Sequence, residues 1–193
     1  MTRIIAGWAG SLTIAVPGVG TRPTSDRVRE AIFSALEARD AIHGMRVLDL
    51  YSGSGALGLE AASRGAAHVT LVDRVIQTSK ANAARILRQA PKDAATIVTT
   101  GQPVQAFLNS ALSYWNLVFM DPPYELPLPE LVRNLQALAA RLEPDAVVVL
   151  ERSSRTPAPE WPEGIEFDKR KDYGDTALYW LTAAQPAAPS QPE

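Results

Sequence analysis

The stretch VLDLYSGSGALGLEA, residues 47–61, joins an apolar run to a glycine-rich loop and then to a second apolar segment. Residues 47–50 predict a buried strand, and the segment after the loop predicts a helix. Between them, Gly53, Gly55 and Gly58 satisfy the spacing G-x-G-x-x-G. Glycines here allow a tight turn, a close approach of a ligand to the backbone, and close packing of the strand on the helix. The stretch therefore predicts a strand–loop–helix unit that either binds a ligand or serves packing alone.

The chain after residue 45 alternates between strand-like and helix-like patterns. The strand-like runs consist almost wholly of large apolar residues, which is typical of strands buried on both faces. Helices between such strands imply right-handed crossovers and a parallel sheet. The expected strands are residues 45–51, 68–73, 95–100, 116–121 and 146–151, with a closing antiparallel hairpin at 165–174 and 176–182; the expected helices are residues 55–65, 75–89, 103–112 and 129–142. We therefore predict a doubly wound α/β fold with a mostly parallel, seven-stranded sheet.

A small extension is expected ahead of this sheet. Short β-prone runs at residues 3–6 and 12–16 flank the segment GWAGS, and this pattern predicts a hairpin. Apolar side chains then recur at three- and four-residue spacing, which predicts a helix from Thr24, its expected N-cap, to about Arg39. The extension is thus a hairpin followed by one helix.

Chain length and composition fit one domain and exclude several kinds of site. The 193 residues are enough for a single core, so we expect one domain over residues 1–182, with residues 1–40 as the extension and residues 41–182 as the core. The Pro/Ala-rich residues 183–193 predict a disordered tail. The chain has no cysteine, which excludes disulfides and thiolate zinc sites and fits a reducing, cytoplasmic location. Its two histidines have no nearby ligand pattern, so we expect no metal.

The charge balance limits the partners that the chain attracts. With 19 Lys+Arg against 21 Asp+Glu, the formal net charge is −2, so no global positive field draws in nucleic acid. Any polyanionic partner must be held by a local basic patch. No apolar stretch approaches the roughly 20 residues that span a bilayer, and we expect neither a membrane segment nor a signal peptide.

Two carboxylates near the glycine loop indicate what kind of ligand it binds. Asp73 ends the next expected strand, 20 residues after Gly53, where a carboxylate accepts hydrogen bonds from ribose hydroxyls. A dinucleotide and S-adenosylmethionine both carry such a ribose. Asp49 favours the second, because its carboxylate repels a pyrophosphate and attracts the ammonium group of a methionine moiety. Its alternative role is to cap the loop's own backbone amides.

A rigid corner follows the fourth expected strand, in the stretch VFMDPPYELP, residues 118–127. Two prolines after Asp121 fix the backbone and remove two N–H donors. In an isolated proline pair this pattern predicts only a turn before the next helix. Ligands of open α/β sheets bind outside the carboxyl ends of the strands, however, and Gly53, Asp73 and Asp121 all belong to that edge.

The motifs together carry a resemblance to a known family. LDLYSGSGALGLEAASRGA, followed by VTLVDR and DPPY, resembles class I S-adenosylmethionine-dependent methyltransferases that act on amino groups. With RIIAG, RPTSDRVREAIFSAL and YGDTAL, nearly the whole chain except the tail is similar to the bacterial family that methylates a guanine N2 in small-subunit (16S) ribosomal RNA. The resemblance implies a Rossmann-like core, S-adenosylmethionine as cofactor, and a monomer that acts on ribosomal RNA within the small subunit or its assembly intermediate. It implies cofactor contacts at Asp49, Tyr51, Gly53, Ser54, Gly55, Gly58, Asp73 and Arg74.

The corner motif acquires a chemical role from this resemblance. An exocyclic amine of a nucleobase is a poor nucleophile because its lone pair is delocalised into the ring. Asp121 is expected to accept a hydrogen bond from that amine, and the backbone held by Pro122 and Pro123 offers the Pro122 carbonyl as a second acceptor. Tyr124 is expected to stack on an extruded base. Its alternative role is a half-buried aromatic that covers the strand end.

The chain departs from the family pattern at two places. Methyltransferases of this kind often carry an acidic or amide residue after the third strand, where it contacts the adenine amino group. The corresponding stretch here, TTGQPVQAF, contains no acid, so we expect Gln102 to make this contact. The family pattern commonly has basic residues around the turn of the hairpin, whereas the segment AGWAGSLT has none. Trp8 of this segment remains a candidate for stacking on an RNA base. For the RNA backbone we expect contacts from Arg22, Arg27, Arg29, Lys169, Arg170 and Lys171. The alternative is a solvated face in which these residues pair with neighbouring acids.

Three other functions remain open at this stage. A DNA adenine-N6 methyltransferase uses the same acceptor chemistry, but 193 residues hold no sizeable target-recognition insertion. A nicotinamide-dependent oxidoreductase uses the same glycine loop, but it leaves Asp49 and the Asp121 corner unexplained. A non-catalytic RNA-binding assembly factor could retain the fold.

Overall fold

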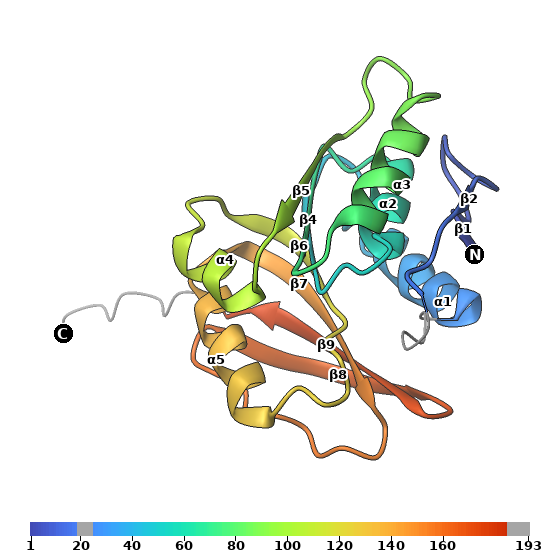
Figure 1. Cartoon of the computed structure of the whole chain (residues 1–193). Helices are drawn as coiled ribbons and strands as arrows, with labels where there is room; N and C mark the ends of the chain where they lie inside the picture. Colours follow the sequence, from blue (N-terminus) through green and yellow to red (C-terminus); the bar gives the residue numbers. More distant parts are fainter. Residues whose placement is uncertain (19–24, 185–193) are drawn as a thin grey trace.

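A seven-stranded sheet forms the centre of the computed structural model, which describes residues 1–18 and 25–184 (Figure 1). The strand order in the sheet is β5-β4-β3-β6-β7-β9-β8, and the pairs from β5 to β7 are parallel, whereas β9 pairs antiparallel with both β7 and β8. The strands are β3 (Arg46–Leu50), β4 (His68–Asp73), β5 (Thr96–Gly101), β6 (Trp115–Met120), β7 (Leu142–Ser153), β8 (Ile165–Tyr173) and β9 (Thr176–Ala183). The predicted fold class is confirmed.

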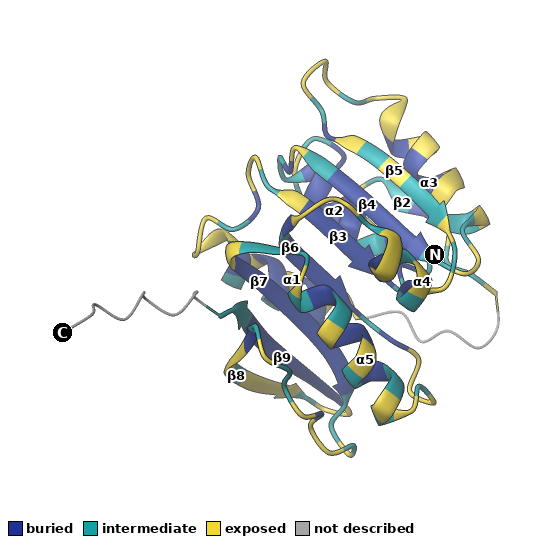
Figure 2. Cartoon of the chain, turned by 90° about the vertical axis from the view of Figure 1, so that its left-hand side faces the viewer, coloured by how far each residue is buried: buried dark blue, intermediate teal, exposed yellow. Residues whose placement is uncertain are grey.

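Helices cover both faces of the sheet, which explains why the central strands are apolar throughout. Side chains alternate between the faces, so Phe119 and Val149 pack in one core while Val118 and Val148 pack in the other. Figure 2 shows the central strands of the sheet as buried. The first core includes residues of α1 (Asp26–Glu37), α2 (Ala56–Ser63) and α3 (Gln77–Leu87), and the second includes residues of α4 (Val104–Ser110) and α5 (Leu128–Ala139). The sheet is therefore the middle layer of a three-layer α/β/α arrangement.

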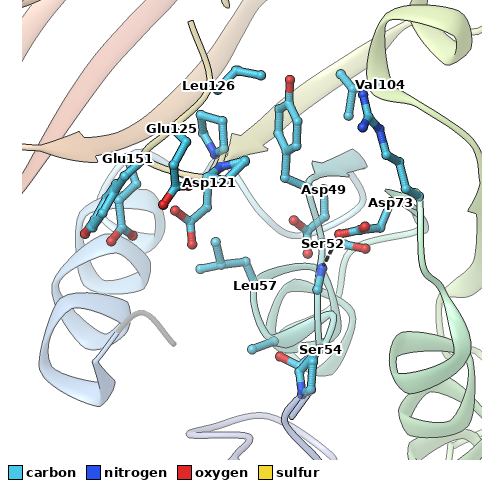
Figure 3. Close-up of a pocket in the computed structure, with 18 of the residues that line it drawn as sticks. Asp49, Ser52, Ser54, Leu57, Asp73, Val104, Asp121, Glu125, Leu126 and Glu151 are labelled. Atoms are coloured by element: carbon cyan, nitrogen blue, oxygen red, sulfur yellow. Dashed lines mark hydrogen bonds between the residues drawn. The ribbon is translucent and has the colours of Figure 1, made fainter. Parts of the chain in front are cut away.

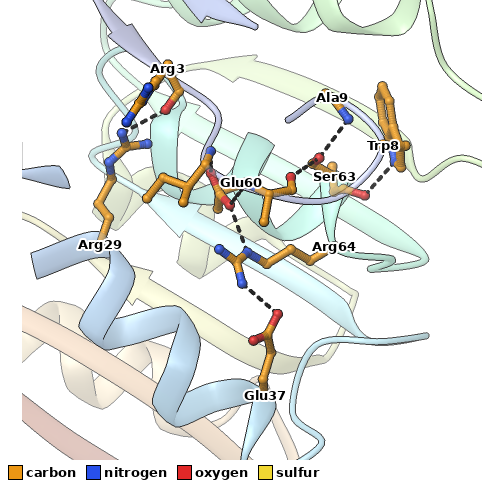
Figure 4. A network of polar contacts seen from close by, with 11 residues as sticks. Arg3, Trp8, Ala9, Arg29, Glu37, Glu60, Ser63 and Arg64 are labelled. Atoms are coloured by element: carbon orange, nitrogen blue, oxygen red, sulfur yellow. Dashed lines mark hydrogen bonds and ion pairs between the residues drawn. The ribbon is translucent and has the colours of Figure 1, made fainter. Parts of the chain in front are cut away.

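The hairpin of the extension is shorter than its β-prone residues predict. Its strands are β1 (Thr2–Arg3) and β2 (Thr13–Ile14), which pair antiparallel. The chain leaves the strand geometry because the backbone N–H groups of Ile5 and Ala6 donate to the buried carboxylate of Glu60 in α2, over 2.6 and 3.0 Å. A side-chain acceptor has replaced a strand partner at these positions (Figure 4).

The first helix begins one residue later than predicted. Ser25 is its N-cap, and the Ser25 hydroxyl accepts from the Val28 backbone N–H over 3.3 Å. Thr24 lies outside the described residues, as does Arg22. The helix ends at Glu37, close to the predicted Arg39.

The end of the chain also differs from the sequence pattern. β9 continues through Ala183, and the Ala184 N–H donates to the Gly164 carbonyl over 2.9 Å, so the ordered fold includes the first two residues of the predicted tail. The remaining tail, residues 185–193, lies outside the described residues. Within the described chain, none of the helices has the length and apolar character needed to cross a membrane.

Candidate active site

A cavity of about 660 Å³ opens at the carboxyl edge of the parallel strands (Figure 3). The register pairs Leu50 with both Val72 and Met120, so β3, β4 and β6 end at the same level. Side chains that follow these strands therefore meet at one place. Among the residues predicted from the sequence, the cavity is lined by Asp49, Tyr51, Gly53, Ser54, Asp73, Arg74, Asp121, Pro122, Pro123, Tyr124 and Arg29.

The glycine loop has the backbone conformation that its sequence predicts. Gly53 and Gly55 have φ angles of 52° and 80°, and the Gly55 N–H donates to the Ser52 carbonyl over 2.6 Å. Tyr51 is the unusual residue, because its φ of 61° is in the left-handed region without the freedom of glycine. Its hydroxyl accepts from the Asn134 side chain of α5 over 2.6 Å. This bond ties the loop to the opposite helical layer.

Gly58 serves packing and does not line the cavity. A Cβ atom at this position would lie 2.4 Å from Leu71 Cδ2 and 3.1 Å from Asp49 Cβ. The Gly58 N–H also donates to Asp49 Oδ2 over 2.9 Å. The third glycine of the motif therefore lets α2 lie against β3 and β4.

We expect Gly58→Ala to lower the free energy of unfolding by about 1–3 kcal/mol, because the new methyl group overpacks the helix–sheet contact. Urea denaturation followed by circular dichroism measures this change. Gly18→Ala is the control, since a Cβ at Gly18 would meet no atom within 4 Å. Equal unfolding midpoints for the two variants would contradict the packing role.

Asp49 combines a structural contact with a position at the cavity. The residue is 2% exposed, and its carboxylate caps the Gly58 amide. Burial raises the pKa of Asp49 to about 7, the Gly58 hydrogen bond opposes the rise, and the charge of Asp73 adds to it. The capping role considered from the sequence is therefore present, while attraction for an ammonium group stays a prediction.

The raised pKa of Asp49 predicts a pH-dependent stability. The folded pKa of about 7 exceeds the ordinary value of 3.8, so the folded state binds the proton more tightly, and stability falls as pH rises through about 7. Between pH 5 and pH 8, the parent's free energy of unfolding should fall by about 2–3 kcal/mol more than that of Asp49→Asn. Urea titrations without cofactor at both pH values give this difference, and an identical fall in parent and variant would show that Asp49 does not titrate there.

Asp73 lies where the loop and the end of β4 meet. Its carboxylate accepts from the Gly53 N–H over 2.9 Å and from the Val75 N–H over 3.2 Å, so the loop holds it in place. A carboxylate can accept about four hydrogen bonds, and these two contacts do not by themselves saturate it. The ribose role of Asp73 stays a prediction, and the location at the cavity is compatible with it.

The amide residue chosen from the sequence is not the one at the cavity. The Gln102 backbone N–H donates to the Asp73 carbonyl over 3.0 Å, but Gln102 does not line the cavity. Gln105, in the first turn of α4, does. The signal that points to it is its place in that first turn, because the start of a helix that follows a parallel strand lies at the carboxyl edge of the sheet.

The corner after β6 is held in place by hydrogen bonds from Arg152, a residue that the sequence pattern did not indicate. The Pro123 carbonyl accepts from the Leu126 N–H over 2.9 Å and from Arg152 Nη1 over 3.4 Å, and Arg152 Nη2 donates to the Leu126 carbonyl over 3.5 Å. Arg152 is 2% exposed, and burial lowers the pKa of its guanidinium group. Tyr124 is 40% exposed and lines the cavity.

Two of the basic residues assigned to RNA have acidic partners close in sequence, one of them buried and the other exposed. Arg29 is 1% exposed, and its Nη2 donates to Asp26 Oδ1 over 2.7 Å and to the Arg3 carbonyl over 2.8 Å (Figure 4). Arg170 pairs with Asp172 over 2.7 Å and donates to the Tyr179 hydroxyl over 3.0 Å. These contacts match the local pairing that was the alternative to RNA binding.

The other predicted RNA contacts among the described residues do not line the cavity. Trp8 donates its indole N–H to the Ala62 carbonyl over 3.0 Å, which fixes the ring at the end of α2. The Lys169 ammonium lies 5.4 Å from the centre of the Trp180 ring. Arg27 and Lys171 are exposed. In residues 1–18 and 25–184, no group of three or more His, Asp or Glu side chains is arranged to hold a metal ion.

Comparisons with known proteins agree with this architecture. Residues 2–182 match the family described as conserved hypothetical protein 95. The ribosomal RNA small subunit methyltransferase D of Escherichia coli (strain K12) is 33% identical over 177 residues, which cover 91% of this chain and 86% of that protein. A solved structure of a hypothetical protein from Thermus thermophilus has a TM-score of 0.78 and 31% identity, and the match covers 93% of this chain and 98% of that one.

A more distant likeness concerns the fold alone. The magnesium protoporphyrin IX methyltransferase of Synechocystis PCC 6803, solved with bound S-adenosylmethionine, has a TM-score of 0.63 and 14% identity, with 86% of this chain and 87% of that one covered. The predicted resemblance is confirmed by the nearer relatives, and with it S-adenosylmethionine as the cofactor. Because the family match spans nearly all of the described fold, the chain belongs to the conserved hypothetical protein 95 family, a family of S-adenosylmethionine-dependent methyltransferases.

Proposed function

We propose that this protein methylates the exocyclic N2 amine of a guanine in 16S ribosomal RNA. The observation that carries the proposal is the position of the Asp121-Pro122-Pro123-Tyr124 corner at the same cavity as the glycine loop. A methyl donor bound at the glycine loop and a target amine bound at the corner would then lie in the same cavity. The name of the Escherichia coli relative, which specifies small-subunit ribosomal RNA, supports the choice of substrate.

The cavity fits the cofactor in size and in chemistry. Its volume of about 660 Å³ lies within the range of about 300–1,000 Å³ that is typical of small-molecule sites. Asp73 would accept from the ribose hydroxyls, and Asp49 would attract the ammonium group of the methionine part. When bound, the cofactor supplies an electrophilic sulfonium methyl group. The contacts of Tyr51, Gly53, Ser54 and Arg74 would hold it over the loop.

The corner residues would act on the target base. Asp121 would accept a hydrogen bond from the N2 amine and stabilise the positive charge that develops on its nitrogen during methyl transfer. The rigid backbone at Pro122 and Pro123 would keep a carbonyl acceptor in place. Tyr124 would stack on the extruded base, because an exposed aromatic face suits any base.

The RNA backbone would be held by local positive charge, since the chain as a whole carries −2. Arg27 and Lys171 are exposed. These two residues are better placed for phosphate contacts than Arg29 and Arg170, whose guanidinium groups already have acidic partners.

The experiment that tests the proposal compares ribosomal RNA from strains with and without the gene. Nucleoside mass spectrometry should find N2-methylguanosine missing from 16S RNA of the deletion strain, and the purified protein with S-adenosylmethionine should restore it. Unmethylated small-subunit particles and free RNA, offered separately, would identify the form that is used.

Other results would favour the alternatives. Loss of N6-methyladenine from DNA would favour the DNA enzyme. RNA binding without any methyl transfer would favour a non-catalytic assembly factor. Either result would overturn the proposed reaction.

A further inference from the structure

Glu151 lies beside Asp121 at the carboxyl edge of the sheet. The parallel register pairs Met120 of β6 with Leu150 of β7, so the next residues, Asp121 and Glu151, stand at the same level on adjacent strands. Side chains alternate along a strand, and both residues continue the face of Phe119 and Val149. Both line the cavity, and Figure 3 shows the two carboxylates on the same side of it.

Glu151 is a buried carboxylate rather than a surface charge. The residue is 7% exposed, and Thr176 Oγ1 donates to its Oε1 over 3.5 Å. An ionised carboxylate accepts hydrogen bonds and donates none, and burial strengthens its preference for donors that replace water. A ligand that brings an N–H donor to this part of the cavity would therefore be favoured.

The strands are ordered in a way that separates the cofactor from the target base. From β4 to β7 the sheet edge carries Asp73, Asp49, Asp121 and then Glu151. The glycine loop and Asp73 belong to the β3–β4 side. Glu151 lies one strand beyond Asp121, on the side away from the glycine loop, where the rest of the target base would extend.

We propose that Glu151 is a specificity-determining residue that accepts a hydrogen bond from N1–H of the target guanine; this inference rests on the proposed function. Guanine presents two donors side by side on its Watson–Crick edge, N1–H and the N2 amine. Two adjacent carboxylates match this pair, with Asp121 on the amine and Glu151 on N1–H. Adenine and cytosine instead present an acceptor nitrogen beside their amine. Glu151 would face that acceptor and repel it, which selects guanine.

The test replaces the donor on the base and the acceptor on the protein in turn. 2-Aminopurine keeps the 2-amine of guanine, but its N1 is an acceptor. Small-subunit particles are assembled around RNA that carries either guanine or 2-aminopurine at the mapped target, and kcat/KM is measured for each. The parent should prefer guanine by about tenfold or more, a typical cost for one mismatched polar contact.

Glu151→Gln should reduce that preference by about tenfold, because the amide can accept from guanine N1–H or donate to N1 of 2-aminopurine. Glu166→Gln, the same change at an exposed position of β8, should keep the parent's preference.

If Glu151 only orders Thr176, Glu151→Gln will lower kcat/KM for both substrates by the same factor. An unchanged preference in Glu151→Gln, with a parent that methylates guanine, would overturn this assignment only. A parent that methylates no guanine would overturn the proposed function and this inference together.

Discussion

Asp121→Ala is expected to lower single-turnover methyl transfer by about 10²–10³ while the affinity for S-adenosylmethionine stays nearly unchanged. Asp121 follows β6 at the cavity, whereas the proposed cofactor contacts come from the loop between β3 and α2 and from the end of β4. Losing one preorganised acceptor at a reacting centre removes stabilisation of the transition state only. Chemistry and cofactor binding should therefore separate in this variant.

Single-turnover transfer to the small-subunit particle, normalised to folded protein by circular dichroism, measures the first quantity, and titration calorimetry measures the second. Asp93→Ala is the matched control, because Asp93 is exposed in the loop between α3 and β5. If the corner is only a rigid turn, Asp121→Ala will lower stability and leave the turnover per folded molecule at the parental level. That outcome would refute the catalytic assignment.

Much of the fold follows from local composition. Strands such as β6 contain almost no polar residue, so their burial on both faces, and hence the parallel sheet between two helical layers, is visible in the sequence. The location of Asp73 and Asp121 at the cavity was predictable for the same reason. Asp73 ends such a strand and Asp121 directly follows one, and parallel strands end together at one edge of a sheet.

The residues that sequence reasoning missed depend on contacts between distant segments. Arg152 is buried because the corner after β6 folds over it, and no pattern near Arg152 indicates this contact. Glu151 lies beside Asp121 only because β7 pairs with β6 in a particular register. The Glu60 carboxylate accepts from the N–H groups of Ile5 and Ala6, which are 55 and 54 residues away in the sequence, and so shortens the amino-terminal hairpin. Local periodicity carries no information about such pairings.

The same limit applies to the basic residues. Arg29 and Arg170 have the sequence pattern of surface charges on a helix and a strand. Their partners are Asp26 and Asp172, close in sequence, together with the Arg3 carbonyl and the Tyr179 hydroxyl, which tertiary packing brings near. The local acids were visible in the sequence, whereas the packing that buries Arg29 was not.

Asp73→Ala is expected to weaken the binding of S-adenosylmethionine by about 10–150-fold, which corresponds to about 1.5–3 kcal/mol for a lost hydrogen bond to a charged group. The carboxylate also accepts from the Gly53 N–H, so a looser loop is a second source of lost affinity.

Titration calorimetry with a 2′-deoxyribose analogue of the cofactor separates the two causes. If Asp73 binds the ribose, the analogue should bind the parent more weakly than the cofactor does, and the variant should discriminate much less between them. If Asp73 only shapes the loop, Asp73→Ala will weaken both ligands by the same factor. Asp73→Asn, whose amide oxygen can still accept from Gly53, should fall between the parent and the alanine variant, because it keeps the loop contact and loses the charge.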